Sequence, residues 1–221
     1  MEEIKKGFKV YGKNFPRLTL PFLILFAVSL LWNRYFPYGG RVLQSLSELG
    51  LAILGLIVVS GATVDTWGAL ENKNFGLHKC WSYVLSSFPK LLLTVSIAAI
   101  PWLLLFYLFL NFFSFFLFVP LAIYPFFFAF TLPELLIGGS GPIETFRNSF
   151  NFSLAHSTRT VLLTYLPIVL VILLITFGFY SLTLLLVLPT WTVLLSSNYC
   201  SLKRNPGPRE YFARFAEDPD R

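Results

Sequence analysis

The sequence predicts an all-α polytopic membrane protein: a helical bundle of six transmembrane helices arranged as three hairpins, each preceded by a cytoplasmic amphipathic interfacial helix. Three observations predict this fold. Of the 221 residues, 56% are hydrophobic and only 13% are charged, against roughly 25% charged residues in soluble domains. The stretches 91–133 and 160–202 carry no charge and far exceed the roughly 20 residues that one span needs, so each is expected to form a hairpin. Basic residues flank the apolar segments.

Six apolar segments are expected to cross the bilayer as helices. Backbone amides in lipid must be satisfied within the segment, and these runs lack the alternating polarity of barrel strands. The first run is followed by no A-x-A-type cleavage site, so we expect it to stay as a span rather than to be removed as a secretory signal. The six expected spans are approximately residues 17–33, 46–69, 91–111, 114–137, 160–177 and 180–198.

The distribution of Lys and Arg predicts the orientation, because basic residues are retained on the cytoplasmic side during insertion. All but two of the 17 fall on one side of the spans; Arg34 and Arg41 alone lie opposite, beside Trp32 and Tyr35, which suit the headgroup level. We therefore expect a protein of the inner or plasma membrane with both termini in the cytoplasm. Anionic lipid headgroups are expected to contact Lys5, Lys6, Lys9, Lys13, Arg17, Lys79, Lys90 and Arg159.

Three segments of the chain match one another in position. Residues 15–18 read Phe-Pro-Arg-Leu, and residues 88–91, 73 positions later, read Phe-Pro-Lys-Leu. A third copy follows after 69 more positions, with Ser157-Thr158 in place of the Phe-Pro pair. Each copy has apolar residues at helical spacing beside basic ones, which is typical of a helix lying in the membrane interface. The pattern predicts pseudo-repeats over about 2–72, 73–140 and 141–204, followed by a polar cytoplasmic tail over 205–221.

Two carboxylates, Asp65 and Glu134, lie near membrane depth. Acids inside a membrane are candidate functional groups because burying them unpaired is unfavourable. Each follows an apolar run that places it near the cytoplasmic boundary, at the level of the basic helices. We expect buried ion pairs there, with Arg147, Lys79 or Lys90 as partners. The alternative is an ion or proton site formed by the same acids.

Proline residues within the spans leave two interpretations open. They can kink or break helices to form transporter sites, or neighbouring helices can repair the interrupted hydrogen bonds. The seven prolines, spread over five spans, are Pro21, Pro101, Pro120, Pro125, Pro133, Pro167 and Pro189.

Catalytic and metal-binding patterns do not emerge. His78 and His156 lie in different loops with no second clustered ligand, no nucleophile has an evident base, and no glycine-rich phosphate loop follows a strand. We expect no enzymatic activity, no metal and no cofactor. Cys80 and Cys200 are placed at the cytoplasmic face, so no disulfide is expected. Membrane topology explains the net charge of +6 without nucleic acid as a partner.

Part of the chain resembles a known membrane family. Leu132-Pro133-Glu134, Gly141-Pro142, Phe146 and Ser149 precede Arg159 and a new span, and the chain ends its last span at Pro189–Tyr199 followed by Lys203-Arg204. This order is similar to the membrane domain associated with glycerophosphodiester phosphodiesterases and its stand-alone relatives. The resemblance implies helical hairpins with amphipathic connectors. That family's activity belongs to a separate soluble barrel, which nothing here encodes.

Two functions remain open from the sequence. The first is a non-enzymatic membrane protein that organises lipid or a partner protein at the cytoplasmic leaflet, with the lipid bilayer, anionic headgroups and a membrane protein or second copy of the chain as partners. The second is a small transporter or channel that uses Asp65 and Glu134 near the cytoplasmic end of the bundle.

Overall fold

The computed structural model describes residues 2–35, 41–71, 77–112, 115–178 and 183–203. These residues form helices and short turns, with no strand among them. Within them six stretches are long and apolar enough to cross a membrane: Phe15–Trp32, Glu48–Leu70, Phe88–Phe112, Val119–Leu136, Ser157–Leu174 and Leu185–Leu202. The predicted all-α fold with six candidate transmembrane helices is confirmed. The expected tail, 205–221, lies outside the described residues.

The chain divides into two compact units, and each combines segments that are distant in sequence. Unit 1 consists of residues 1–85 and 166–198, and unit 2 of residues 86–165 and 199–221. The division falls inside α9 (Ser157–Thr176) and α11 (Leu188–Leu202), and before the last residue of α4 (Leu77–Ser86).

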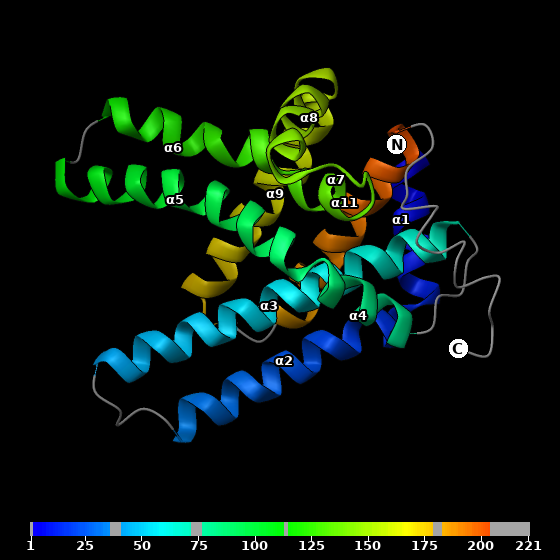
Figure 1. Ribbon diagram of the computed structural model, residues 1–221, viewed down its shortest axis with the longest axis horizontal. Helices are drawn as coiled ribbons and strands as arrows, with labels where there is room; N and C mark the ends of the chain where they lie inside the picture. Colours follow the sequence, from blue (N-terminus) through cyan, green and yellow to red (C-terminus); the bar gives the residue numbers. More distant parts are fainter. Residues whose placement is uncertain (1, 36–40, 72–76, 113–114, 179–182, 204–221) are drawn as a thin grey trace. The chain divides into compact units, whose positions relative to one another are not determined.

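Unit 1 is built on two antiparallel helices, α2 (Phe15–Tyr35) and α3 (Arg41–Leu70), which pack along each other (Figure 1). Its other elements are α1 (Glu2–Lys13), α4 (Leu77–Ser86), the second half of α9, the short π-helix η1 (Thr183–Val187) and the first part of α11. Phe22, Val58 and Ala62 are buried between α2 and α3, with Trp81 of α4 packed against them. Burial of such apolar side chains is the main favourable contribution to packing in water, whereas in lipid close contact and polar bonds do more.

Gly7 sets the distance between α1 and α11 in unit 1. A Cβ atom at this position would lie 3.2 Å from both Leu194 Cδ2 and Ser197 Oγ. Small residues allow two helices to approach closely within a membrane. Gly7 is accordingly buried, while Lys5, Lys9 and Lys13 on the same helix are exposed.

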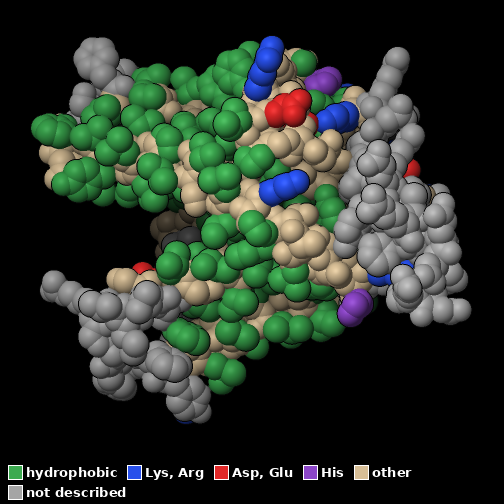
Figure 2. All heavy atoms as spheres, in the orientation of Figure 1, with side chains coloured by type: hydrophobic (Ala, Val, Ile, Leu, Met, Phe, Trp, Pro, Cys, Tyr) green, Lys and Arg blue, Asp and Glu red, His purple; other side chains and the backbone are tan. Residues whose placement is uncertain are grey.

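Unit 2 contains α5 (Phe88–Phe112), α6 (Phe115–Phe128), α7 (Thr131–Leu136), α8 (Pro142–Ala155) and the start of α9. Helix α5 packs along α6, and α8 packs against α5, α6 and α7 (Figure 1). Hydrophobic side chains cover α5 and α6 in Figure 2, whereas Lys, Arg, Asp and Glu gather at the α7–α8 end. Large apolar side chains exposed to this extent suit a lipid environment rather than water.

The expected span 114–137 is broken in the structure. Helix α6 ends at Phe128, and α7 begins at Thr131. Pro133 favours the break, because proline has no N–H to donate to the carbonyl of Ala129 and fits best in the first turn of a helix. The break places Glu134 in a separate short helix, with its own amide bonded to Phe130 O at 2.9 Å.

Two tyrosines of unit 2 bond backbone carbonyls in the helical turn before a proline. Tyr124 Oη donates to Ala98 O at 2.7 Å, three residues before Pro101, and Tyr165 Oη donates to Ala122 O at 2.7 Å, three residues before Pro125. A proline ring displaces the preceding turn and leaves its carbonyls without regular partners. Neighbouring helices therefore satisfy these carbonyls, which is the repair expected of proline in membrane helices.

Three single residues separate a short helix from a long one. Asn14 lies between α1 and α2, Ser87 between α4 and α5, and His156 between α8 and α9. Hydrogen bonds continue across each junction: Leu18, Leu91 and Thr160 donate their amides to the junction carbonyls at 2.9, 2.9 and 3.0 Å. The long helices therefore begin two or three residues earlier than the expected starts at 17, 91 and 160.

Candidate functional site

Asp65 is the centre of a charged cluster in unit 1. It lies near the end of α3 and is 5% exposed. Arg17, the third residue of α2, forms an ion pair with Asp65 Oδ1. The antiparallel course of α2 and α3 brings the beginning of one helix to the end of the other, so these two residues meet although 48 positions separate them.

Cys80 of α4 completes this cluster. Its Sγ atom lies 3.8 Å from Asp65 Oδ1, and the residue is 1% exposed. Burial, together with the nearby Asp65 carboxylate, raises the pKa of the Cys80 thiol to about 12. The thiol is therefore protonated at neutral pH and acts as a weak donor rather than a nucleophile. Asp65 thus joins three helices: α2, α3 and α4.

Glu134 is the centre of a larger polar cluster in unit 2. The residue is 1% exposed, and both carboxylate oxygens accept several bonds. Lys203 Nζ lies 2.9 Å from Oε1 and 2.8 Å from Oε2. Ser140 Oγ and Asn148 Nδ2 donate to Oε1 at 2.6 and 2.9 Å, and Tyr199 Oη donates to Oε2. Glu134 thus joins α7, α8 and the end of α11.

The donors of Glu134 also bond to one another. Lys203 Nζ donates to Tyr199 Oη at 2.6 Å, and Asn148 Nδ2 donates to Ser140 Oγ at 3.1 Å. Such a network is favourable when every member is satisfied, since the interior screens charge poorly. The cluster therefore has the character of a clamp that holds its helices in one arrangement.

Gly138 allows this clamp to close. A Cβ atom on Gly138 would lie 2.6 Å from Tyr199 Oη and 2.9 Å from the carboxyl carbon of Glu134. Neither atom can move away without breaking its hydrogen bonds. The next residue, Gly139, has φ +71°, a left-handed conformation that other residues rarely adopt, and it turns the chain toward Ser140.

An aromatic group packs beside the Glu134 cluster. Phe152 of α8 lies 4.8 Å from Phe130, 5.3 Å from Tyr199 and 4.8 Å from His156 between ring centroids. Phe130 and Tyr199 are fully buried. The rings thus give Tyr199, a donor to the carboxylate, apolar neighbours, and charges interact more strongly in apolar surroundings than in water.

The remaining residues predicted for a site lie apart from these two clusters. Arg147, Lys90, Lys5, Lys9 and Lys13 are exposed, Lys79 and Arg159 are half-buried, and Lys6 lies in α1. The sequence suggested Arg147, Lys79 or Lys90 as partners of the two acids. The structure gives these positions to Arg17, expected to contact headgroups, and to Lys203, expected only to flank the last span.

Sequence reasoning also missed Ser140, Asn148 and Tyr199. The Gly138-Gly139-Ser140-Gly141 segment, which begins four residues after Glu134, was the available signal, because glycines there indicate a close backbone approach. Tyr199 and Lys203 are four residues apart and share a helix face, but nothing in the sequence shows which helix they meet.

Neither cluster has the composition of a metal centre. No group of three or more His, Cys, Asp and Glu side chains lies together within the residues that the structure describes. Each acid is bonded by cationic and neutral donors, as in a structural ion pair.

Comparison with known protein families, with characterised proteins and with solved structures finds no match. The resemblance to the membrane domain of glycerophosphodiester phosphodiesterases therefore stays a prediction.

Proposed function

We propose that the protein is a non-enzymatic multi-pass membrane protein that gathers anionic lipid at the cytoplasmic leaflet. One observation carries this proposal: α1 exposes Lys5, Lys9 and Lys13 together with Phe8, which is 51% exposed, directly before the first candidate span. Cationic and apolar side chains on one short helix suit the headgroup region, where each basic residue near the surface contributes about 1 kcal/mol of attraction to anionic lipid.

The orientation in this proposal places both termini in the cytoplasm. Nearly all Lys and Arg residues flank the same ends of the spans, and basic residues resist translocation. The exceptions lie at the opposite ends of two helices: Arg34 in the last turn of α2 and Arg41 at the start of α3. In this orientation α1 faces the leaflet that carries anionic lipid.

The proposal includes three hairpins related by internal repetition. The junction residues Asn14, Ser87 and His156 support it, because they are 73 and 69 positions apart, the same spacings that align the sequence segments. Each junction joins a short helix to a candidate span. Three basic helices at one membrane surface would multiply the attraction of a single one.

The rival function is a small transporter or channel using Asp65 and Glu134. It would require at least one acid to exchange its protein partners for an ion or a proton. The four side chains that bond Glu134 favour a fixed clamp over such exchange. Ion flux into proteoliposomes that is abolished by Asp65→Asn or Glu134→Gln would decide for the rival.

The lipid function can be tested by extracting the protein from membranes with an amphipathic polymer. The resulting nanodiscs keep the surrounding lipid, whose composition is then measured. Replacing Lys5, Lys6, Lys9 and Lys13 with Gln is expected to lower the ratio of anionic to zwitterionic lipid in the discs severalfold, given about 1 kcal/mol for each basic residue. The matched control replaces Arg34 and Arg41, on the other expected side, and should leave the ratio unchanged. An unchanged ratio in the lysine variant would contradict the proposal.

A further inference from the structure

A pocket in unit 1 is lined only by apolar side chains. It has a volume of about 290 Å³, close to the lower end of small-molecule sites at roughly 300 Å³. Helix α2 contributes most of the lining through Leu20, Pro21, Ile24, Leu25 and Val28. A cavity lined in this way does not hold water, because water needs several polar partners.

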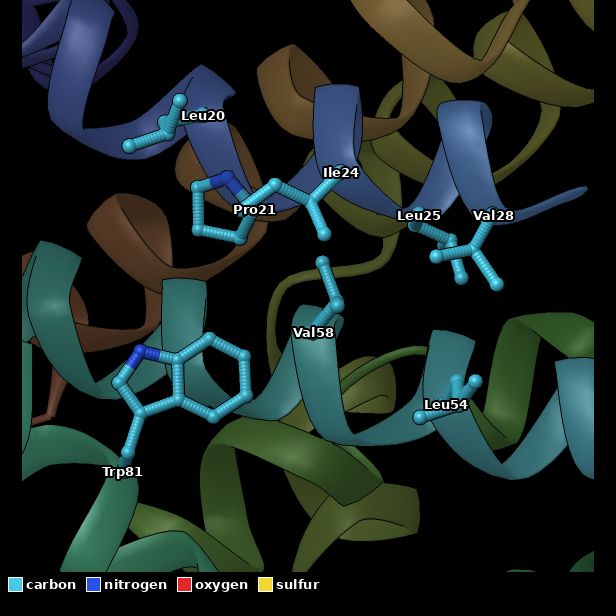
Figure 3. A pocket seen from close by; sticks show the side chains of 8 residues that line it. All are labelled: Leu20, Pro21, Ile24, Leu25, Val28, Leu54, Val58 and Trp81. Atoms are coloured by element: carbon cyan, nitrogen blue, oxygen red, sulfur yellow. The ribbon is translucent and has the colours of Figure 1, made fainter. Parts of the chain in front are cut away.

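The other wall comes from α3 and α4. Figure 3 shows Val58 of α3 facing Ile24, with the Trp81 indole near Pro21 at one end and Leu54 near Val28 at the other. From Leu20 to Val28 the pocket follows α2 for about 12 Å at 1.5 Å per residue. The pocket is therefore elongated along the candidate spans, as a hydrocarbon chain in a bilayer leaflet is.

The pocket is open to its surroundings. Leu20 is 49% exposed, Ile24 55% and Leu54 44%, although all three line it. In a bilayer these surfaces face lipid tails, which can enter from the side. An empty apolar pocket beside hydrocarbon forfeits dispersion contacts that a tail would restore.

Cationic side chains precede the pocket residues of α2 along the chain. Leu20 follows Arg17 by one helical turn, and Cys80, next to Trp81, contacts Asp65. Helix α1 packs against α2 and α3 and ends with exposed Lys13, with Lys9 exposed one turn earlier. These two lysines can meet a phosphate whose chain enters the pocket, and the amphipathic Trp81 ring suits the same depth.

We propose that this pocket holds one acyl chain of an anionic phospholipid, with the headgroup against Lys9 and Lys13. The inference rests on the proposed lipid function and gives it a specific site. The occupant is one lipid molecule whose acyl chain lies along α2. It binds in addition to the anionic lipid that is generally enriched around α1.

Photolabelling tests the site. The purified protein is reconstituted in phosphatidylcholine vesicles that contain either phosphatidylglycerol or phosphatidylcholine with a diazirine in one acyl chain. After irradiation, peptides carrying α2 residues 20–28 and Trp81 are expected to be labelled severalfold more by the phosphatidylglycerol probe. Equal labelling by the two probes would overturn the proposal.

Two pairs of substitutions separate the pocket from the rest of the lipid-facing surface. Ile24→Phe with Val28→Phe narrows the pocket and should lower labelling of the Trp81 peptide severalfold. Leu23→Phe with Leu30→Phe changes exposed positions of the same helix outside the pocket and should leave that labelling unchanged. A pocket pair that labels like the unmodified protein would also overturn the proposal.

Failure of the site and failure of the proposed function give different results. If only the site is wrong, pocket labelling shows no preference, while the lysine variant still loses anionic lipid from extracted discs. If only the general function is wrong, the lipid composition of the discs does not change, while the phosphatidylglycerol probe still labels the Trp81 peptide more than the phosphatidylcholine probe does.

Lys9→Gln with Lys13→Gln tests the headgroup contact. The double change should abolish the preference for the phosphatidylglycerol probe but keep labelling itself. A retained preference would overturn the headgroup assignment.

Discussion

Asp65 in unit 1 and Glu134 in unit 2 perform similar structural tasks by different means. Each is a buried acid near the end of a candidate span, each bonds to the short helix that follows, and each has one cationic partner. Within the described part of the chain, Asp65 is bonded only to Arg17 and the weak Cys80 thiol. Glu134 is bonded to Lys203 and to three neutral donors.

The difference concerns redundancy. A buried carboxylate that loses its only strong partner keeps its charge at high free energy or must take up a proton. One that keeps three hydrogen bonds is still substantially stabilised. The two cationic side chains are about equally exposed, 28% for Arg17 and 30% for Lys203, so exposure does not separate them. The number of remaining donors should therefore decide which cluster is more sensitive to loss of its cation.

The largest effect is expected for Arg17→Met. This change leaves Asp65 with the thiol of Cys80 alone and should lower the free energy of unfolding by about 3–5 kcal/mol, the usual effect of breaking a buried ion pair. Denaturation of the purified protein in mixed micelles measures it. Adding Asp65→Asn should recover most of the loss, because no uncompensated charge remains. The control Lys13→Met removes an exposed cation one turn earlier and should change little.

A smaller effect is expected for Lys203→Met. Ser140, Asn148 and Tyr199 still donate to Glu134, so the loss should be about 1–3 kcal/mol in the same measurement, the range for one unsatisfied buried polar interaction. Arg147→Met is the matched control, because Arg147 is exposed on α8 and should have little influence. If Lys203→Met proved more damaging than Arg17→Met, redundancy would not be what distinguishes the clusters.

The sequence predicted the candidate transmembrane helices better than the polar contacts between helices. Long uncharged runs identify candidate spans by length alone, because 20 apolar residues have few alternatives to a membrane helix. The depth of Asp65 and Glu134 followed from counting residues along those runs. Their partners could not be found in this way, since an ion pair depends on which helix ends meet, and that is decided by packing across 48 and 69 positions.

Arg17 and Lys203 show why this misled the prediction. A basic residue beside an apolar run is usually read as a headgroup contact, because long cationic side chains extend readily toward the membrane surface. Both residues turn inward instead, toward an acid on another helix. The break between α6 and α7 was missed for a similar reason. Seven prolines were candidates for kinks, and only the structure distinguishes Pro133, which lies just after a break between two helices, from Pro101, which lies inside one continuous helix.

The smallest expected effect is on the alkylation rate of Cys80. This rate tests whether water reaches the Asp65 cluster. A thiol pKa of about 12 leaves about one thiol in ten thousand ionised at pH 8, and the thiolate is the reactive form. In a Cys200→Ser protein, alkylation of Cys80 by iodoacetamide should therefore be very slow and should accelerate about tenfold for each pH unit up to pH 10 without levelling off. Levelling near pH 9 would indicate an ordinary thiol in contact with water. That outcome would mean that Asp65 is also hydrated and has more support than its two protein partners, and the expected difference between Arg17→Met and Lys203→Met would then shrink.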